Sequence, residues 1–536
     1  MLKTPSKNVN VLGQKETSYN TICFATKSPD FVKTLVLLFI TTVSRTCKKT
    51  KPKKWWDNIK LLYGLSKPPS LIKIHVDGAE LKDGELSEAL NDCFTNVTSD
   101  IQPLDLTPVD TNHSPDEYVI SPESVEKALL SIKERKSNGP DDIPNWVLKN
   151  FASVIYSPIC SLFNSSINEG YVPPLRKCAN VIPINKVPRP TSINSDFRPI
   201  SLTPVLSKIL EGFVFEWLAA IIMPNIDPYQ YGCVKKSSTT HALVHLTHHW
   251  LNATEAPNTV IRSCLIDFSK AFDRIDHTIL LHKLQLFNTP QVLLNWCANF
   301  RTNQKQRVCL NSFFSPWKHV HAGVPQGTKL GSLFFLVMVN DLRTSDLPLY
   351  KYVDDCTIYE VLTKGESSIL ENELNKIVEW TNSNNMKINV TKTKDLSISF
   401  LKNSLPAERL TVNNQSLDPI RSSKLLGVNL STDLKWSIHI DEVCARASKR
   451  LFALSPLKRN GVPPADLRSV YCYFIRPLLE YAYPVWHSSL TCTLNNQLED
   501  IQRRALRIIY PQMSYKDSIT QFNLPTLYDR RQLLCE

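Results

Sequence analysis

The stretch PLYKYVDDCTI, residues 348–358, places two adjacent acids, Asp354 and Asp355, between two apolar, β-prone flanks. This pattern predicts a β-hairpin with both carboxylates at its tip. Two carboxylates at one turn repel each other unless a cation or hydrogen-bond donors offset their charge. Alone, two adjacent acids more often mark a solvated turn than a catalytic or metal-binding site. Whether this pair has a function therefore depends on the rest of the chain.

A third acid lies earlier in the chain, within SCLIDFSKAFD, residues 263–273. The apolar run from Val260 to Ile266 predicts a buried strand, and Asp267 directly follows it. Brought beside the acidic hairpin, Asp267 would complete a site for two hard divalent cations, because Mg²⁺ prefers oxygen ligands and keeps substrate phosphates in its shell. Two such ions about 4 Å apart stabilise the attacking and leaving oxygens of an in-line phosphoryl displacement.

Between these acids lies a glycine-containing loop, AGVPQGTKLGS, residues 322–332, which runs into the apolar stretch LFFLVMVNDL. Glycines allow the backbone to approach a ligand closely, and the apolar stretch predicts a buried helix. One such loop indicates little. The three segments in this order and at this spacing indicate a single catalytic constellation.

Together these segments resemble the reverse transcriptases of non-long-terminal-repeat (LINE-type) retrotransposons, and most of all the CR1/Jockey-like group. The resemblance extends from about Trp55 to the C-terminus. It implies an RNA-directed DNA polymerase that extends a DNA primer on an RNA template from dNTPs. It also implies that Asp267, Asp354 and Asp355 are catalytic ligands of two Mg²⁺ ions, with Mn²⁺ as an alternative.

The resemblance further implies which residues contact the nucleotide sugar and the template. Phe272 matches the aromatic residue that stacks under the sugar and clashes with a 2′-hydroxyl group. Gln326 and Gly327 match the central residues of the segment that contacts template and incoming nucleotide. We therefore expect these three residues to bind substrate.

Three basic residues are assigned to the phosphates in the same way. The segment VIPINKVPRPTSINSDFRPISL, residues 181–202, matches the strands that hold the triphosphate, with Lys186 and Arg198 as the cations. NMKINVTKTK, residues 385–394, matches a later block in which Lys392 would protonate the leaving pyrophosphate. Without the resemblance, all three would be interpreted as solvated surface charges.

The implied fold is α+β: a right-hand polymerase with fingers, a palm built on an antiparallel sheet plus helices, and a helical thumb. We expect a variable N-terminal helical region with a basic segment at 1–110, fingers at 111–260, the palm at 261–430 and the thumb at 431–536. Helical spacing in the last region supports this: Leu498, Ile501, Ala505 and Ile508 form one apolar stripe.

Local signals predict two further helices. One begins near Pro122, with apolar residues Val125, Ala128, Leu129 and Ile132 at helical spacing. The other precedes the Lys392 segment and has an apolar face formed by Leu370, Leu374 and Ile377. Ser368 and Glu371 have the spacing of a capping box, which predicts that this helix begins there.

Four positions depart from the family pattern. Ser332 stands where a proline usually follows the glycine, and Val353 where alanine is commoner. Cys233 stands where the usual aromatic–glycine–aromatic run has its second aromatic residue, and Asp142 replaces a glycine that would ease a turn. None of the four is an expected carboxylate ligand.

Composition agrees with a nucleic-acid partner. The 536 residues include 62 Lys and Arg against 50 Asp and Glu, a net charge of +12. Lysines cluster from Lys48 to Lys54, directly before Trp55 and Trp56, which suits phosphate binding with base stacking, a nuclear-import signal or a solvated linker. We expect nuclear and cytoplasmic localisation.

Other features argue against secretion and membrane insertion. The 14 cysteines are scattered, with no C-x-x-C pair, which indicates a reducing compartment rather than disulfides or zinc sites. The longest apolar run, from Phe31 to Val43, is interrupted by Lys33 and is too short to span a bilayer. It predicts a core or docking helix, and we expect no membrane partner.

Two alternatives and one missing activity remain. The chain could be a catalytically silent nucleic-acid-binding relic, although all three acids are present. A group II intron maturase or viral RNA polymerase is disfavoured by the C-terminal match. The endonuclease usual in this family has no recognisable motifs here, so we expect a piece of a longer reading frame or a truncated copy, with the endonuclease acting separately or lost.

Overall fold

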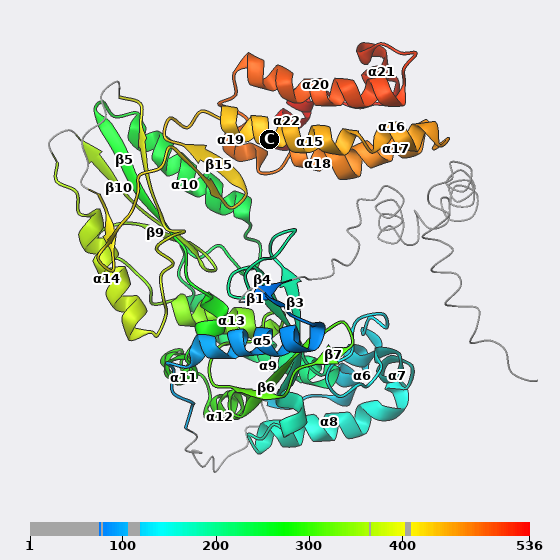
Figure 1. Ribbon diagram of the computed structural model, residues 1–536, viewed down its shortest axis with the longest axis vertical. Coiled ribbons are helices and arrows are strands. Elements are labelled where there is room, and N and C mark those ends of the chain that lie inside the picture. Colours follow the sequence, from blue (N-terminus) through cyan, green and yellow to red (C-terminus); the bar gives the residue numbers. More distant parts are fainter. Residues whose placement is uncertain (1–73, 77–78, 106–117, 364–365, 402–408, 536) are drawn as a thin grey trace, which may run out of the picture. The chain divides into compact units, whose positions relative to one another are not determined.

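The computed structural model describes residues 74–76, 79–105, 118–363, 366–401 and 409–535 (Figure 1). The chain divides into two compact units, one comprising Leu71–Lys435 and the other containing Trp436–Glu536. The lysine cluster Lys48–Lys54 and the apolar run Phe31–Val43 lie outside the described residues. The predicted mixture of helices and sheets is confirmed.

A four-stranded antiparallel sheet lies in the Leu71–Lys435 unit, in the order β11-β5-β10-β9. Its strands are β5 (Thr259–Ile266), β9 (Leu349–Tyr352), β10 (Asp355–Thr363) and β11 (Lys394–Ser399). Every residue of β5 is buried, as predicted from its apolar run. The sheet therefore joins three segments that are far apart in the sequence.

A second sheet of the same unit places β3 (Cys178–Asn185) between β4 (Phe197–Leu202) and β6 (Gln304–Leu310). The β3–β4 pair is antiparallel and the β3–β6 pair is parallel. β7 (Phe313–Phe314) and β8 (Lys318–Val320) both pair with β6. The helix α5 (Asp83–Thr95) packs against β6 and β7, where Leu86 and Leu90 are fully buried.

Helices surround the two sheets. They are α6 (Pro122–Leu130), α7 (Asn145–Asn150), α8 (Ala152–Asn168), α9 (Val205–Ile222), α10 (Thr239–Thr254), α11 (His277–Leu286), α12 (Gln291–Arg301), α13 (Lys329–Val339) and α14 (Leu370–Ser383). α13 packs against α9 and α11, and from Leu330 to Val339 every residue except Ser332 is buried, as its apolar sequence predicts. α10 packs against β5 and β9, and α14 against β10.

Short strands complete this unit. They are β1 (His75–Val76) with β2 (Ala79–Glu80), β12 (Thr411–Val412) with β13 (Gln415–Ser416), and β14 (Ser422–Leu425) with β15 (Val428–Ser431). The helix predicted near Pro122 is α6, which Ser121 caps by accepting a hydrogen bond from the Ser124 amide. α6 ends at Leu130, so Ile132 lies beyond it.

The capping box predicted at Ser368 is wrong. Ser368 Oγ instead donates to Glu360 of β10, and Glu360 Oε2 accepts hydrogen bonds from the Ile369 and Leu370 amides at 2.9 and 3.1 Å. A carboxylate is a stronger acceptor than a hydroxyl at the positive end of a helix, so Glu360 displaces the serine from the capping position. Glu371 accepts a hydrogen bond from Thr411 Oγ1 at 2.6 Å. The predicted apolar face of α14 is confirmed, because Leu370, Leu374 and Ile377 are buried.

The Trp436–Glu536 unit is helical in its described part, as predicted. It comprises α15 (Ser437–Leu451), α16 (Leu454–Arg459), α17 (Pro464–Val470), a π-helical turn (Tyr471–Ile475), α18 (Arg476–Leu479), α19 (Tyr483–Trp486), α20 (Cys492–Ile509), α21 (Tyr515–Gln521) and α22 (Leu527–Cys535). α20 packs on α15 and buries Leu498, Ile501 and Ala505, whereas Ile508 is half-buried.

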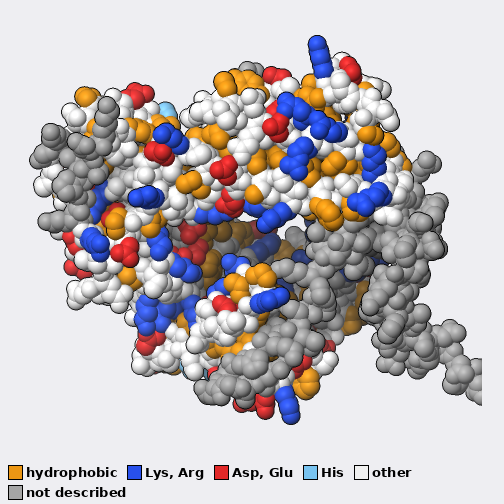
Figure 2. Space-filling model, turned by 45° about the horizontal axis from the view of Figure 1, so that its top comes forward, with side chains coloured by type: hydrophobic (Ala, Val, Ile, Leu, Met, Phe, Trp, Pro, Cys, Tyr) orange, Lys and Arg blue, Asp and Glu red, His pale blue; other side chains and the backbone are white. Residues whose placement is uncertain are grey.

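The molecular surface carries dispersed positive charge. Figure 2 shows Lys and Arg side chains spread over the visible face rather than gathered in one patch. All twelve cysteines in the described ranges are free. In those ranges, no helix combines the length and apolarity needed to cross a bilayer.

Candidate active site

The acidic hairpin forms as predicted. β9 ends at Tyr352, β10 begins at Asp355, and these two residues pair across the strands. Val353 and Asp354 therefore form a two-residue turn. Val353 has a φ of 60°, a left-handed conformation that a β-branched residue rarely adopts. A tight turn with positive φ at its first central residue matches the twist of the flanking strands.

The third acid lies across the sheet from this hairpin. β10 and β5 pair Cys356 with Ile266, so one further step along the same register places Asp355 opposite Asp267. The loop before β11 holds Asp267 through its backbone: the Asp267 amide donates to Thr393 Oγ1 at 3.3 Å, and its carbonyl accepts from the Asn389 amide at 2.7 Å. All three predicted carboxylates thus lie at one end of the sheet.

Burial and mutual repulsion change the acidity of this cluster. Burial raises the pKa of Asp354, and the negative charge of Asp267 raises it further. Burial, with the charges of Asp354 and Asp267, raises the pKa of Asp355 to about 6. Like charges held this close indicate a site that gains stability when a cation enters.

The donor set fits a hard divalent cation. Asp267 Oδ2 is buried and accepts no hydrogen bond, with the Lys392 ammonium 3.6 Å away. The charge of Asp267 raises the pKa of both Asp354 and Asp355. In the described ranges no three His, Cys, Asp or Glu side chains already converge as a metal cage. The acids thus lie near one another without forming a closed coordination shell.

Cations face these acids from two other segments. Lys186 directly follows β3, and Arg198 lies on β4, where it pairs with Ile184. Arg198 and Lys392 both lower the pKa of Asp354, against the effect of burial. Partial burial, then the charges of Lys392 and Arg198, lower the pKa of Lys186. The structure therefore brings the three predicted phosphate-binding cations into one electrostatic cluster with the acids.

The hairpin between β3 and β4 fixes Lys186. Its amide donates to the Asp196 carbonyl at 2.7 Å and its Nζ donates to the Ser195 carbonyl at 2.9 Å. Asp196 in turn accepts hydrogen bonds from the Thr191 and Ser192 amides. The ammonium group is thus held where the loop leaves the two strands, while the side chain remains exposed.

Phe272 lies in a short 3₁₀ turn, η6 (Ala271–Arg274), after Asp267. Its ring stacks on Phe335 of α13, with centroids 4.5 Å apart and planes 19° from parallel. Phe272 is half-buried, so one side of the ring packs into the core. This packing fixes the orientation of the ring.

Gln326 contacts a residue that sequence reasoning missed. Its Nε2 donates to Asp273 Oδ1 at 3.0 Å, and its carbonyl accepts from the Ser201 amide at 3.2 Å. Burial raises the pKa of Asp273 to about 6. Gly323 has a φ of +85°, and a Cβ there would lie 2.5 Å from the Asp273 carbonyl oxygen. The glycine loop is therefore clamped between η6 and β4.

Gly327 lies at the exposed end of the same loop with a φ of +107°, a conformation that favours glycine. Thr328 follows and caps α13 by accepting a hydrogen bond from the Gly331 amide. A pocket beside the loop is lined by residues that include Arg176, Lys177, Ser201, Asp273, Lys305 and Gln326. This pocket contains both basic and hydrogen-bonding side chains.

The mixture of helices and sheets around this cluster agrees with a reverse transcriptase domain. Residues 184–430 match the reverse transcriptase (RNA-dependent DNA polymerase) family. The matched segment contains the predicted acids and cations, from Lys186 to Lys392.

Similarity to individual proteins extends beyond this domain. The RNA-directed DNA polymerase from mobile element jockey of Drosophila melanogaster is 25% identical over 475 residues, which cover 82% of this chain and 51% of the relative. The jockey protein of Drosophila funebris is 27% identical, covering 72% and 43%, and the probable RNA-directed DNA polymerase from transposon BS of Drosophila melanogaster is 26% identical, covering 72% and 44%. The chain spans about half the length of these relatives. The predicted resemblance to LINE-type reverse transcriptases is confirmed.

Proposed function

We propose that this chain is an RNA-directed DNA polymerase of a non-LTR retrotransposon, which extends a DNA primer on an RNA template by adding dNTPs. The observation that carries the proposal is the convergence of Asp267, Asp354 and Asp355 at one end of an antiparallel sheet. Arg198 and Lys392 lie close enough to Asp354 to lower its pKa, and the same two cations lower the pKa of Lys186.

The three acids are the residues that would hold two Mg²⁺ ions, or Mn²⁺ in their place. When bound, such ions stabilise the attacking and leaving oxygens of the phosphoryl transfer. Lys186 and Arg198 bind the β- and γ-phosphates, where the guanidinium group can donate two parallel hydrogen bonds. Lys392 supplies a proton to the leaving pyrophosphate.

The remaining predicted residues select and orient the nucleotide. Phe272, whose ring is fixed against Phe335, blocks a 2′-hydroxyl group and so favours deoxyribose. Gln326 and Gly327 position the template and the incoming nucleotide on a loop that Asp273 and Ser201 hold in place.

The right-hand architecture belongs to this proposal. The four-stranded sheet that bears the acids would be the palm, 261–430, with β5 beginning two residues before it at Thr259, and the β3–β4 hairpin would belong to the fingers, within 111–260. Residues 431–536 would form the thumb and 1–110 a variable N-terminal region. We further propose that an endonuclease acting separately, or lost from the chain, nicks the target, and that the protein is found in nucleus and cytoplasm.

Primer extension tests this function. Wild-type protein should extend a DNA primer on an RNA template with Mg²⁺ and dNTPs, and Asp354→Ala/Asp355→Ala should abolish extension. The control Asp105→Ala/Asp418→Ala removes the same charge from exposed positions and should extend normally. If no protein extends the primer while all bind the hybrid, the polymerase proposal fails and the silent-relic alternative stands.

A further inference from the structure

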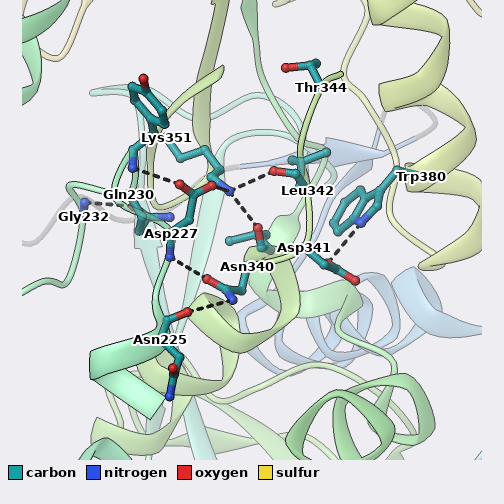
Figure 3. Close-up of polar contacts among 12 residues, drawn as sticks. Asn225, Asp227, Gln230, Gly232, Asn340, Asp341, Leu342, Thr344, Lys351 and Trp380 are labelled. Atoms are coloured by element: carbon teal, nitrogen blue, oxygen red, sulfur yellow. Dashed lines mark hydrogen bonds and ion pairs between the residues drawn. The ribbon is translucent and has the colours of Figure 1, made fainter. Parts of the chain in front are cut away.

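A buried polar network joins β9 to the end of α13 (Figure 3). Lys351, on β9 directly before Tyr352, is 1% exposed, and its Nζ lies 2.6 Å from Asp227 Oδ2. The same Nζ donates to the Val339 and Leu342 carbonyls at 3.1 and 2.9 Å. These three partners satisfy the three donors of the ammonium group. They also place its charge at the C-terminal end of α13, where a cation is favoured.

Asp227 belongs to a segment that runs along the free edge of β9. The Lys351 amide donates to the Tyr229 carbonyl at 2.9 Å, and the Tyr231 amide donates to the Lys351 carbonyl at 2.8 Å. Asp227 Oδ1 accepts from the Tyr229 amide at 3.0 Å, while the Asp227 amide donates to Asn340 Oδ1 at 2.8 Å. The segment is therefore tied to both β9 and the end of α13.

This segment presents Gln230 to the hairpin turn. Gln230 is 5% exposed, and its Oε1 accepts hydrogen bonds from the Gly232 amide at 2.9 Å and the Val353 amide at 3.0 Å. A Cβ on Gly232 would lie 2.4 Å from Val353 Cγ2, so only glycine allows these two backbone segments to come this close. One side-chain oxygen thus links the segment to the first residue of the acidic turn.

We propose that Gln230 is a positioning residue for the carboxylates of Asp354 and Asp355. Its hydrogen bond holds Val353 in the left-handed conformation, and that conformation sets the direction in which the next two residues leave the turn. The buried Lys351–Asp227 ion pair fixes the segment that carries Gln230. This inference rests on the proposed polymerase function in one respect: that function makes Asp354 and Asp355 catalytic.

Without the hydrogen bond from its amide to Gln230, Val353 would favour a different type of turn. A β-branched residue disfavours positive φ, so without its acceptor the turn would relax toward negative φ. Turns with negative φ at this position splay the two strands of a hairpin. Both carboxylates would then move, although β9, β10 and the core of the sheet would remain folded.

The test compares Gln230→Met, which removes the acceptor at similar volume, with Gln230→Glu, which keeps an acceptor oxygen. The matched control is Gln285→Met, at an exposed position of α11. For Gln230→Met we expect kcat for nucleotide addition to fall by about 10-fold or more, with KM for dNTP changed by less than about threefold. Gln230→Glu should recover most of the lost kcat.

Two measurements are independent of activity. Deuterium exchange of peptides that cover 349–358 should be faster in Gln230→Met than in the wild type, at unchanged melting temperature. Binding of Mn²⁺ alone, followed by electron paramagnetic resonance, should be weaker in the same variant. If wild-type protein does not extend primers, the polymerase proposal fails while these two measurements still decide the role of Gln230.

A double-mutant cycle with Val353→Gly adds a second criterion. Glycine adopts positive φ without strain, so Gln230→Met should cost less kcat in the Val353→Gly background than in the wild type. Additive effects, or wild-type exchange and Mn²⁺ binding in Gln230→Met, would overturn the proposal. The proposal would also be overturned if Gln230→Met and Gln230→Glu lost kcat equally and lost melting temperature equally, since Gln230 would then serve folding alone.

Discussion

Lys392 Nζ lies 3.6 Å from Asp267 Oδ2, so a cation in the loop before β11 forms an ion pair with the acid that follows β5. The lysine side chain is 66% exposed and the aspartate side chain 29% exposed. The pair therefore keeps an exposed ammonium group beside Asp267.

Replacing Lys392 should slow chemistry more than binding. Lys392→Ala is expected to lower the rate of single-nucleotide incorporation by about 10²-fold, because a positioned proton donor contributes that much to the transition state. The affinity for the template–primer hybrid should change little. Rapid-quench incorporation assays with Lys127→Ala, an exposed lysine of α6, as the control would check this. An unchanged rate would exclude Lys392 as the proton donor.

Removing the Phe272 ring should relax sugar selection. Because the ring is fixed against Phe335, Phe272→Ala opens space where a 2′-hydroxyl group would otherwise clash. We expect the preference for dNTP over rNTP, measured as the ratio of kcat/KM values, to fall by about 10-fold or more. Phe313→Ala, at an aromatic residue 52% exposed on β7, should leave the ratio unchanged. The same ratio in both variants would contradict the assignment.

A buried carboxyl group away from the acidic cluster predicts a pH dependence of stability. Glu211 of α9 is 1% exposed, and burial raises its pKa from 4.5 to about 7, against the effects of Arg301 and Lys208. A raised pKa means that the folded state binds more protons than the unfolded state between these values. The Glu211 contribution to stability is therefore complete below pH 4.5 and is lost as pH rises through 7.

Glu211→Gln removes this titration. We expect the wild type to lose up to about 3 kcal/mol of unfolding free energy between pH 5 and pH 8 relative to Glu211→Gln. Urea unfolding at the two pH values measures the difference, with Glu88→Gln as a surface control. Identical pH profiles for wild type and Glu211→Gln would show that Arg301 keeps the carboxylate ionised in the folded protein.

Three departures from the family pattern have left-handed backbones: Val353 in the acidic turn, and Asp142 and Cys233 outside it, with φ of 52° and 59°. Glycine adopts such backbones without steric cost. Asp142→Gly and Cys233→Gly should each raise the free energy of unfolding by about 1 kcal/mol, measured by denaturant titration. Asp83→Gly, in the first turn of α5, should lower it. A loss of stability at Asp142 or Cys233 would mean that the side chain makes a compensating contact.

Local sequence patterns predict the features that depend on neighbouring residues. The end of β5 at Ile266 and the Asp354–Asp355 hairpin follow from apolar runs and adjacent acids, and both are confirmed. The cap of α14 was predicted wrongly because Glu360, on a different element, supplies it. Likewise, no local pattern pairs Lys351 with Asp227. The only sequence signal of this ion pair is Lys351 itself, a charged residue inside an apolar strand, which requires a buried partner.

The order of strands in the acidic sheet also constrains when the site can form during synthesis. β5 is made first, yet its neighbours β10 and β11 are made long after it, with several helices between them. A chain emerging from the ribosome cannot close the sheet until β11, ending at Ser399, has left the exit tunnel. β5 has neither partner until β10 emerges and only one until β11 emerges, so its apolar residues need temporary cover from a chaperone or from non-native contacts.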